Sequence, residues 1–161
     1  MQFLEQVDAS ALRKHEDSLN PVPNVRLGSY GMPPPEQFEL WRVTLEERDL
    51  DKMFVLFDFV EHTIGLHGKL SGIRPSGGFK ERVEKKIQQN LDLRLSPKLA
   101  VVIVTVDWKE WPLILADGNH RATAQYLKHG TITGVPAFVC KHPNICFWTN
   151  TPIESRKRLA L

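Results

Sequence analysis

The sequence predicts an α+β protein with a single domain, and three observations lead to this expectation. The chain has 161 residues, which is near the common size of one domain. Hydrophobic residues make up 42% of it and charged residues 25%, as in ordinary globular proteins. Short apolar, β-branched runs alternate with stretches of helical spacing, and no internal repeat is present. We therefore expect one core that folds without a metal or a disulfide.

The first part of the chain, residues 1–35, is predicted to be an irregular arm. Residues 7–13 fit a short strand and turn. Prolines and glycines oppose long regular structure in this arm, and they are Pro21, Pro23, Gly28, Gly31, Pro33, Pro34 and Pro35.

Residues 36–78 are predicted to hold a strand, a helix and a glycine-rich loop. Alternation of apolar and polar residues over 38–45 predicts the strand. Apolar residues over 50–64 recur at spacings that predict a helix with a wide apolar face, which Gly65 ends. The composition of residues 65–79 predicts a mobile loop, which is either a binding loop or a plain solvated loop.

Residues 79–142 are predicted to form the main unit of strands and helices. Its elements are expected to be a basic amphipathic helix (79–91), a hairpin of two apolar runs (99–106 and 111–116), a helix (119–128) and a strand (135–140). Residues 143–161 follow as a C-terminal extension, in which 152–159 is predicted to be a short basic helix.

The most informative segment joins the second apolar run to the helix that follows it. The apolar run stops at Asp117-Gly118, and the helix starts with Asn119-His120-Arg121. A strand that turns through glycine into a helix directs N–H groups and the positive end of the helix dipole toward one point, which suits an anion. The alternative is a capped turn with His120 and Arg121 solvated. Because cations are unfavourable in a first helical turn, an anion between them is the favoured interpretation.

Phosphate is the anion that these residue types suit best. Gly118 lets the backbone approach a phosphate, and the amides of Asn119, His120 and Arg121 can donate to it. Arg121 offers a bidentate fork, and His120 offers a second donor whose charge changes near neutral pH. Asp117 is the candidate to hold Mg²⁺ or to orient a water molecule. Asp117, His120 and Arg121 are thus the candidate catalytic residues for phosphoryl hydrolysis or transfer.

The run DGNHRATAQYLKHGTITGVPAFV resembles the nucleotide-binding core of the ParB/sulfiredoxin superfamily, in the D-G-x-H-R form of ParB-related kinases and nucleases. The resemblance covers roughly residues 79–142. It implies a small mixed sheet with flanking helices, binding of ATP or CTP, and ATP hydrolysis or Mg²⁺-dependent DNA cleavage. Plasmid-encoded oncogenic-suppression fertility inhibitors, which inhibit conjugation, are short members attributed with both activities. The matching residues are Gly118, His120, Arg121, Ala122, Ala124, Gly130, Val135 and Pro136.

This sequence departs from the superfamily at two points, and each departure excludes one activity or protein class from the expected functions. Sulfiredoxins place their catalytic cysteine where this chain has Asn119, so reduction of sulfinic acids is not expected. ParB partition proteins continue into a helix-turn-helix domain, whereas this sequence stops soon after Val139, so a whole partition protein is not expected either. In the arm, Leu12-Arg13-Lys14-His15 is weakly similar to a "leucine, basic, histidine, proline" segment of the superfamily.

Charge is distributed unevenly, although the net charge is only +2. Residues 36–61 hold eight acidic and three basic residues, and residues 69–98 hold eight basic and three acidic residues. The acidic segment is a candidate face for a protein partner, and the alternative is that both segments are solvated faces. The resemblance implies that the helix before the central strands contacts nucleotide phosphates. The candidate is Lys80, which lies nearest the glycine-rich loop. The candidates for DNA contacts on the same helix are Arg82, Lys85 and Lys86.

Other features predict a cytoplasmic protein without a membrane partner. No apolar stretch is long enough to span a bilayer, and the first residues have no signal-peptide pattern. Cys140 and Cys146 lack the spacing of a zinc site and are expected to be buried free thiols, although a disulfide between them is the open alternative. The histidines expected to be structural or exposed are His62, His67, His129 and His142.

Three classes of function remain open at this point. The first is an enzyme, an ATPase or Mg²⁺-dependent nuclease of the ParB-like type. The second is a nucleotide-sensing or DNA-binding module without catalysis. The third is an interaction protein in which the acidic segment 36–61 docks a partner. The intact turn at 117–121 argues against the third class.

Overall fold

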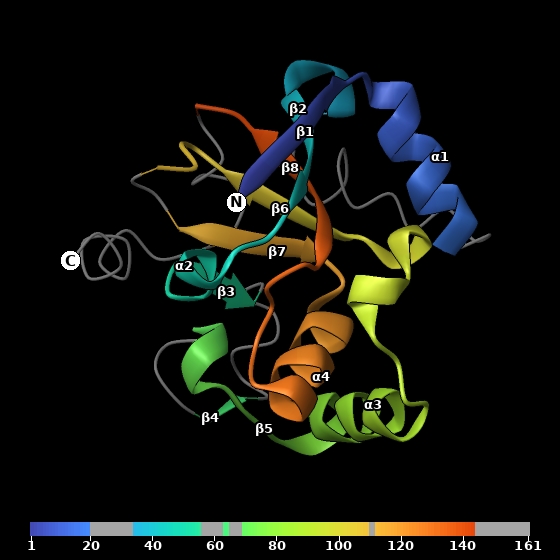
Figure 1. Ribbon diagram of the computed structural model, residues 1–161, viewed down its shortest axis with the longest axis vertical. Coiled ribbons are helices and arrows are strands. Elements are labelled where there is room, and N and C mark those ends of the chain that lie inside the picture. The colour runs from blue at the N-terminus through green and yellow to red at the C-terminus, as the bar shows by residue number, and fades with distance from the viewer. Residues whose placement is uncertain (20–33, 56–62, 65–68, 110–111, 144–161) are drawn as a thin grey trace.

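The computed structural model describes residues 1–19, 34–55, 63–64, 69–109 and 112–143. A mixed sheet lies at its centre (Figure 1). Its six strands, in spatial order, are β1 (Gln2–Val7), β2 (Glu39–Thr44), β8 (Pro136–Lys141), β6 (Val101–Thr105), β7 (Leu113–Asp117) and β3 (Met53–Val55). The helices are α1 (Ala9–Leu19), α2 (Glu47–Leu50), α3 (Gly77–Gln88) and α4 (Asn119–His129), and β4 (Thr63–Ile64) pairs with β5 (Arg74–Pro75).

Both parallel and antiparallel pairs occur in the large sheet. β6 is parallel to β8, and β3 is parallel to β7, whereas the other neighbouring strands are antiparallel. The α+β class and the mixed sheet with flanking helices are therefore confirmed.

Side chains that alternate along the central strands enter two separate cores. On one face, Ile103 belongs to the cluster that includes Phe79 of α3 and Ala122 of α4. On the other face, Val102 belongs to the cluster that includes Leu12 of α1. Every residue of β6 and β7 is buried, which explains why both strands appear in the sequence as uninterrupted apolar runs.

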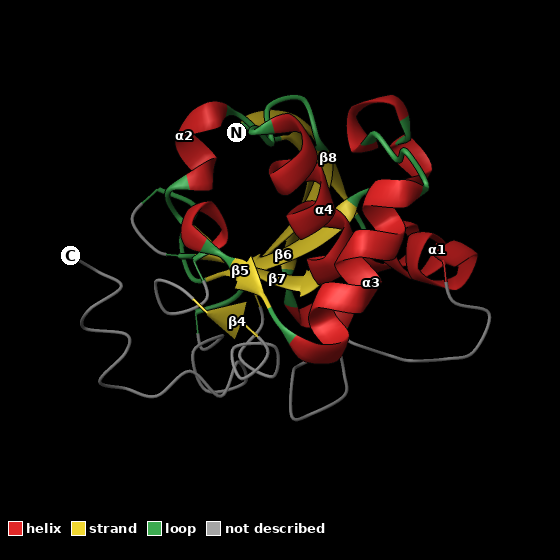
Figure 2. Ribbon diagram, turned by 90° about the horizontal axis from the view of Figure 1, so that it is seen from below, coloured by secondary structure: helices red, strands yellow, loops and turns green. Residues whose placement is uncertain are grey.

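Helices α3 and α4 lie side by side on the same face of the sheet (Figure 2). Phe79 in the first turn of α3 contacts His120 in the first turn of α4, with 4.7 Å between ring centroids. Beyond the last turn of α3, Asn90 accepts a hydrogen bond from Lys128 near the end of α4. The N-terminal ends of the two helices are therefore neighbours.

Most of the elements predicted within 79–142 are confirmed. The helix predicted over 79–91 is α3, which begins earlier, at Gly77. β6 and β7 form the predicted antiparallel hairpin, and α4 ends at Gly130, which adopts φ +70°. Cys140 on β8 is buried, as expected.

The prediction of an irregular arm over residues 1–35 is wrong for its first part. Residues 2–7 form the edge strand β1, and α1 follows it directly. Asp8 starts this helix, because its Oδ1 accepts hydrogen bonds from the amide of Ala11 at 3.1 Å and from the hydroxyl of Ser10 at 2.6 Å. Leu12 then anchors α1 on the sheet with its side chain fully buried.

The helix predicted over residues 50–64 is also wrong. Only the short helix α2 precedes a turn, and residues 53–55 then form β3, which pairs in parallel with β7. All three residues of β3 are buried. A short run that is apolar at every position has no period that distinguishes a buried strand from a buried helix.

The loop predicted over 65–79 contains regular structure in its described part. Leu70–Gly72 forms a 3-10 helix, β5 follows, and Leu70 and Ile73 enter the core. Predictions for the helix at 152–159, for Cys146, and for His62 and His67 lie outside the described residues. Within the described part, no helix has both the length and the apolar character needed to cross a membrane.

Candidate functional site

The candidate site is the turn between β7 and α4, residues 117–121. Gly118 occupies the left-handed region with φ +83°. A Cβ atom at this position would lie 2.8 Å from Cγ1 of Val101, so both the backbone conformation and the available space require glycine. The first hydrogen bond of α4 runs from the amide of Ala122 to the carbonyl of Gly118 at 2.8 Å. The predicted strand, glycine turn and helix are thus present.

Asp117 closes this turn from inside the protein. Its side chain is buried, and Oδ1 accepts a hydrogen bond from the amide of Gly118 at 2.5 Å. Oδ2 accepts from Nη2 of Arg121 at 3.3 Å. The carboxylate therefore stabilises the turn and forms an ion pair with the first turn of α4.

Arg121 is largely covered by the protein, contrary to the alternative in which it is solvated. Only 14% of its side chain is exposed. Nη2 donates to Asp117 and, at 3.4 Å, to the carbonyl of Ala100. Nε is buried without a hydrogen-bond partner among the described residues. Burial lowers the pKa of Arg121 below its ordinary value, but a guanidinium in a protein stays charged.

His120 and Asn119 differ in the direction of their side chains. The partly buried ring of His120 packs against Phe79, with an interplanar angle of 35°. Asn119 is buried, and its Nδ2 donates to the carbonyl of Leu115 at 3.1 Å. Asn119 therefore contributes its side chain to the packing of α4 on β7, and its backbone amide belongs to the first turn of the helix.

His15 of α1 reaches the same place, and the sequence did not identify it as a site residue. Its Nε2 lies 2.9 Å from the carbonyl oxygen of Ala100. A carbonyl only accepts hydrogen bonds, so Nε2 carries the hydrogen. The pKa of His15 is lowered, chiefly by burial, and the hydrogen bond to Ala100 opposes this shift. The similarity at Leu12-Arg13-Lys14-His15 was the available signal, but its helix was not predicted.

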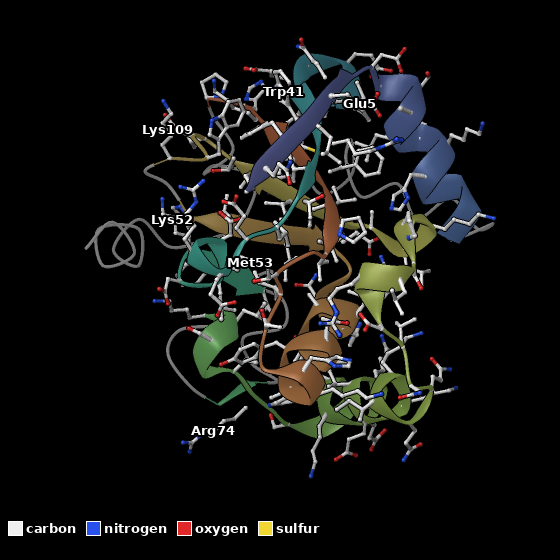
Figure 3. The ribbon with its side chains drawn as sticks, in the orientation of Figure 1. Glu5, Trp41, Lys52, Met53, Arg74 and Lys109 are labelled. Atoms are coloured by element: carbon white, nitrogen blue, oxygen red, sulfur yellow. The ribbon has the colours of Figure 1, made fainter. Side chains whose placement is uncertain are left out.

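The cations predicted on α3 lie on its outer surface. Lys80 is 57% exposed and lies 3.6 Å from Oε1 of Glu84, one turn along the same helix. Arg82 and Lys85 are exposed and Lys86 is half-buried. Arg74 of β5, in the same basic segment, points away from the protein (Figure 3). The structure therefore brings Arg121, Gly118 and Asp117 together but does not bring Lys80 into contact with them.

The residues of the turn do not fit a Mg²⁺ site. In the described part of the chain, no three histidine, cysteine, aspartate or glutamate side chains come together as ligands. Asp117 already accepts hydrogen bonds on both oxygens, one of them from a guanidinium that a divalent cation would repel. The assignment of Asp117 as a metal ligand is not supported by this geometry.

Acidic residues in the described part of segment 36–61 have partners within the protein. Glu36 pairs with Arg13 of α1, and Glu47 accepts hydrogen bonds from Thr131 at 2.7 Å and Thr133 at 2.9 Å. Lys141 of β8 lies 3.2 Å from Glu39. These carboxylates connect distant segments of the fold, which leaves less negative charge for a protein partner.

Comparisons with protein-family models, with curated proteins and with solved structures find no match to this chain.

Proposed function

We propose that the turn at residues 117–121 binds the phosphate groups of a nucleotide, and that the chain is a nucleotide-binding domain of the ParB/sulfiredoxin-like type. The observation that carries the proposal is the state of Arg121. It is a largely covered cation at the start of a helix, and its buried Nε has no hydrogen-bond partner among the described residues.

A guanidinium has five N–H donors, and Arg121 uses only Nη2 among its three nitrogens within the described structure. Both of the bonds from Nη2 are long, at 3.3 and 3.4 Å. Asp117 balances the charge of Arg121 but leaves the buried Nε without an acceptor. A phosphate has acceptor oxygens at the spacing of the arginine N–H groups, so it would give Nε the hydrogen-bond acceptor that it lacks.

The backbone supports the same ligand. The amides of a first helical turn have no acceptor within the helix, and Gly118 has no side chain with which to cap them. The positive end of the dipole of α4 adds to the charge of Arg121 at this point. The resemblance of the D-G-x-H-R pattern to a nucleotide-binding superfamily favours a nucleotide over a free phosphate ion.

Binding without catalysis is the form of the proposal that the geometry favours. ATP hydrolysis or DNA cleavage needs a group that activates water, and Asp117 was the candidate. Its carboxylate is buried and accepts hydrogen bonds from Gly118 and Arg121, so it acts as a part of the turn. His120 is the remaining candidate for acid–base chemistry. A phosphate-release assay run beside the binding assay separates an ATPase from a nucleotide sensor.

The test is a calorimetric titration of the protein with ATP, CTP and duplex DNA, with and without Mg²⁺. The decisive variant is Arg121→Lys, which keeps a positive charge opposite Asp117 but loses the planar fork. We expect nucleotide affinity to fall at least about tenfold in this variant. The matched control is Arg82→Lys on the exposed side of α3, for which we expect no change. Equal nucleotide affinity in the wild type and in folded Arg121→Lys would contradict the assignment.

A further inference from the structure

Two groups that can carry positive charge meet at one backbone carbonyl. The oxygen of Ala100 accepts from Arg121 at 3.4 Å and lies 2.9 Å from Nε2 of His15. We propose that binding of a nucleotide at Arg121 is coupled to proton uptake by His15, so that the affinity of the site depends on pH. This inference rests on the proposed function and adds a regulatory residue from a helix distant in sequence.

The position of His15 is determined by the packing of α1 on the sheet. Its side chain is only 9% exposed, and its ring lies 4.9 Å from the ring of Phe138 on β8. Nε2 donates to a carbonyl at the start of β6, 85 residues further along the chain. Because the ring contacts both Phe138 and the carbonyl of Ala100, we expect it to gain or lose a proton without changing its position.

Burial and two nearby positive charges lower the pKa of His15 and so disfavour its protonated form. Arg121 faces it from α4 and Arg42 faces it from β2, and both oppose its protonation. Burial acts in the same direction and is the larger effect. On its own helix, Arg13 pairs with Glu36. On the other side of Arg121, Asp117 forms an ion pair with its guanidinium.

A bound nucleotide changes this balance. Phosphate oxygens at Arg121 bring negative charge close to one of the two cations that oppose protonation of His15. Solvent screens the interaction less than at the surface, because His15 is buried and only 14% of the Arg121 side chain is exposed. The nucleotide therefore favours the protonated form of His15. By thermodynamic reciprocity, protonation of His15 strengthens nucleotide binding by the same factor.

The experiment measures His15 directly. We would follow the ring Cε1–H resonances of the histidines by NMR over a pH titration, with and without saturating ATP, and assign His15 with the variant His15→Gln. We expect ATP to raise the pKa of His15 by about one pH unit. His129, at the far end of α4, is the internal control and is expected not to shift.

A second measurement compares ATP affinity across pH in the wild type and in His15→Gln. Glutamine keeps an N–H donor for the carbonyl of Ala100 but does not titrate. Ionisation of ATP and of His120 affects both proteins equally, so the difference between them isolates His15. We expect the wild type to gain about tenfold in affinity on acidification relative to the variant.

The outcomes separate the two proposals. If ATP binds and the pKa of His15 does not move, the coupling is wrong and the proposed function stands. If ATP, CTP and DNA all fail to bind, both proposals are overturned. Identical pH profiles for the wild type and His15→Gln would likewise overturn the coupling.

Discussion

Helices α3 and α4 are neighbours, and both have glycine and cations at or near their N-terminal ends, yet the surroundings of these residues differ strongly. Gly118 precedes α4 in a confined left-handed turn, whereas a Cβ at Gly78 of α3 would meet nothing within 4 Å. The side chain of Arg121 on α4 is only 14% exposed, whereas that of Lys80 on α3 is 57% exposed. The combination of glycine and cations in a sequence is therefore not a site by itself. Burial of the cation is what creates the need for an anion.

We expect the largest difference in stability between the two helices when each of these two glycines is replaced by alanine. Gly118→Ala places a residue with a Cβ at φ +83° and directs it into Val101. We expect a loss of about 3 kcal/mol in the free energy of unfolding, from backbone strain and overpacking together.

The matched variant is Gly78→Ala, at a helical position with open space. We expect it to be neutral or to stabilise the protein by up to about 1 kcal/mol. Chemical denaturation of both variants measures these values. Equal destabilisation at the two positions would show that the turn at Gly118 is not the more constrained one.

The next largest effect is expected from removing a cation from each helix. Arg121→Ala removes the guanidinium that pairs with the buried carboxylate of Asp117. We expect a loss of about 2 kcal/mol in the free energy of unfolding, less than for a fully buried pair because the ion pair is long and partly exposed.

Arg82→Ala on the surface of α3 is the control, with an expected change within about 0.5 kcal/mol. Thermal and urea unfolding measure both variants. An equally small loss for Arg121→Ala would mean that its burial has no energetic consequence.

The smallest effect on stability is expected from reversing two charges on α3, Lys85→Glu together with Lys86→Glu. We expect a loss below about 1 kcal/mol and unchanged ATP affinity, because neither side chain contacts the turn among the described residues. If α3 contacts duplex DNA through phosphates, the double variant removes about two contacts and flattens the log–log salt dependence of DNA binding by about 2. Fluorescence anisotropy at several salt concentrations measures this slope, and an unaltered slope would exclude α3 as the DNA surface.

The sequence predicted best what depends on neighbouring residues. Gly118 and Gly130 mark the two ends of α4, and the buried runs of β6 and β7 have the expected hairpin pairing. These features follow from local conformational limits and from burial on both faces of a strand.

Elements whose stability depends on distant partners were not predicted. β1 is an edge strand with mostly exposed residues, and it is stabilised by pairing with β2, which follows more than thirty residues later. The burial of Arg121 also depends on the carbonyl of Ala100, 21 residues away, and His15 enters the site from α1. No local pattern records these contacts, so the sequence predicted Arg121 as a site residue without its burial.

The most direct test of the central claim is the NMR signal of the Arg121 Nε–H group during titration with ATP. This hydrogen has no acceptor among the described residues, so a phosphate bound by the fork of Arg121 gives it one. We expect its resonance to move downfield and to saturate with the same dissociation constant as calorimetry, while the Nε–H of Arg82 stays in place. Saturable ATP binding with no change at Arg121 Nε–H would contradict the account, because the nucleotide would then bind elsewhere.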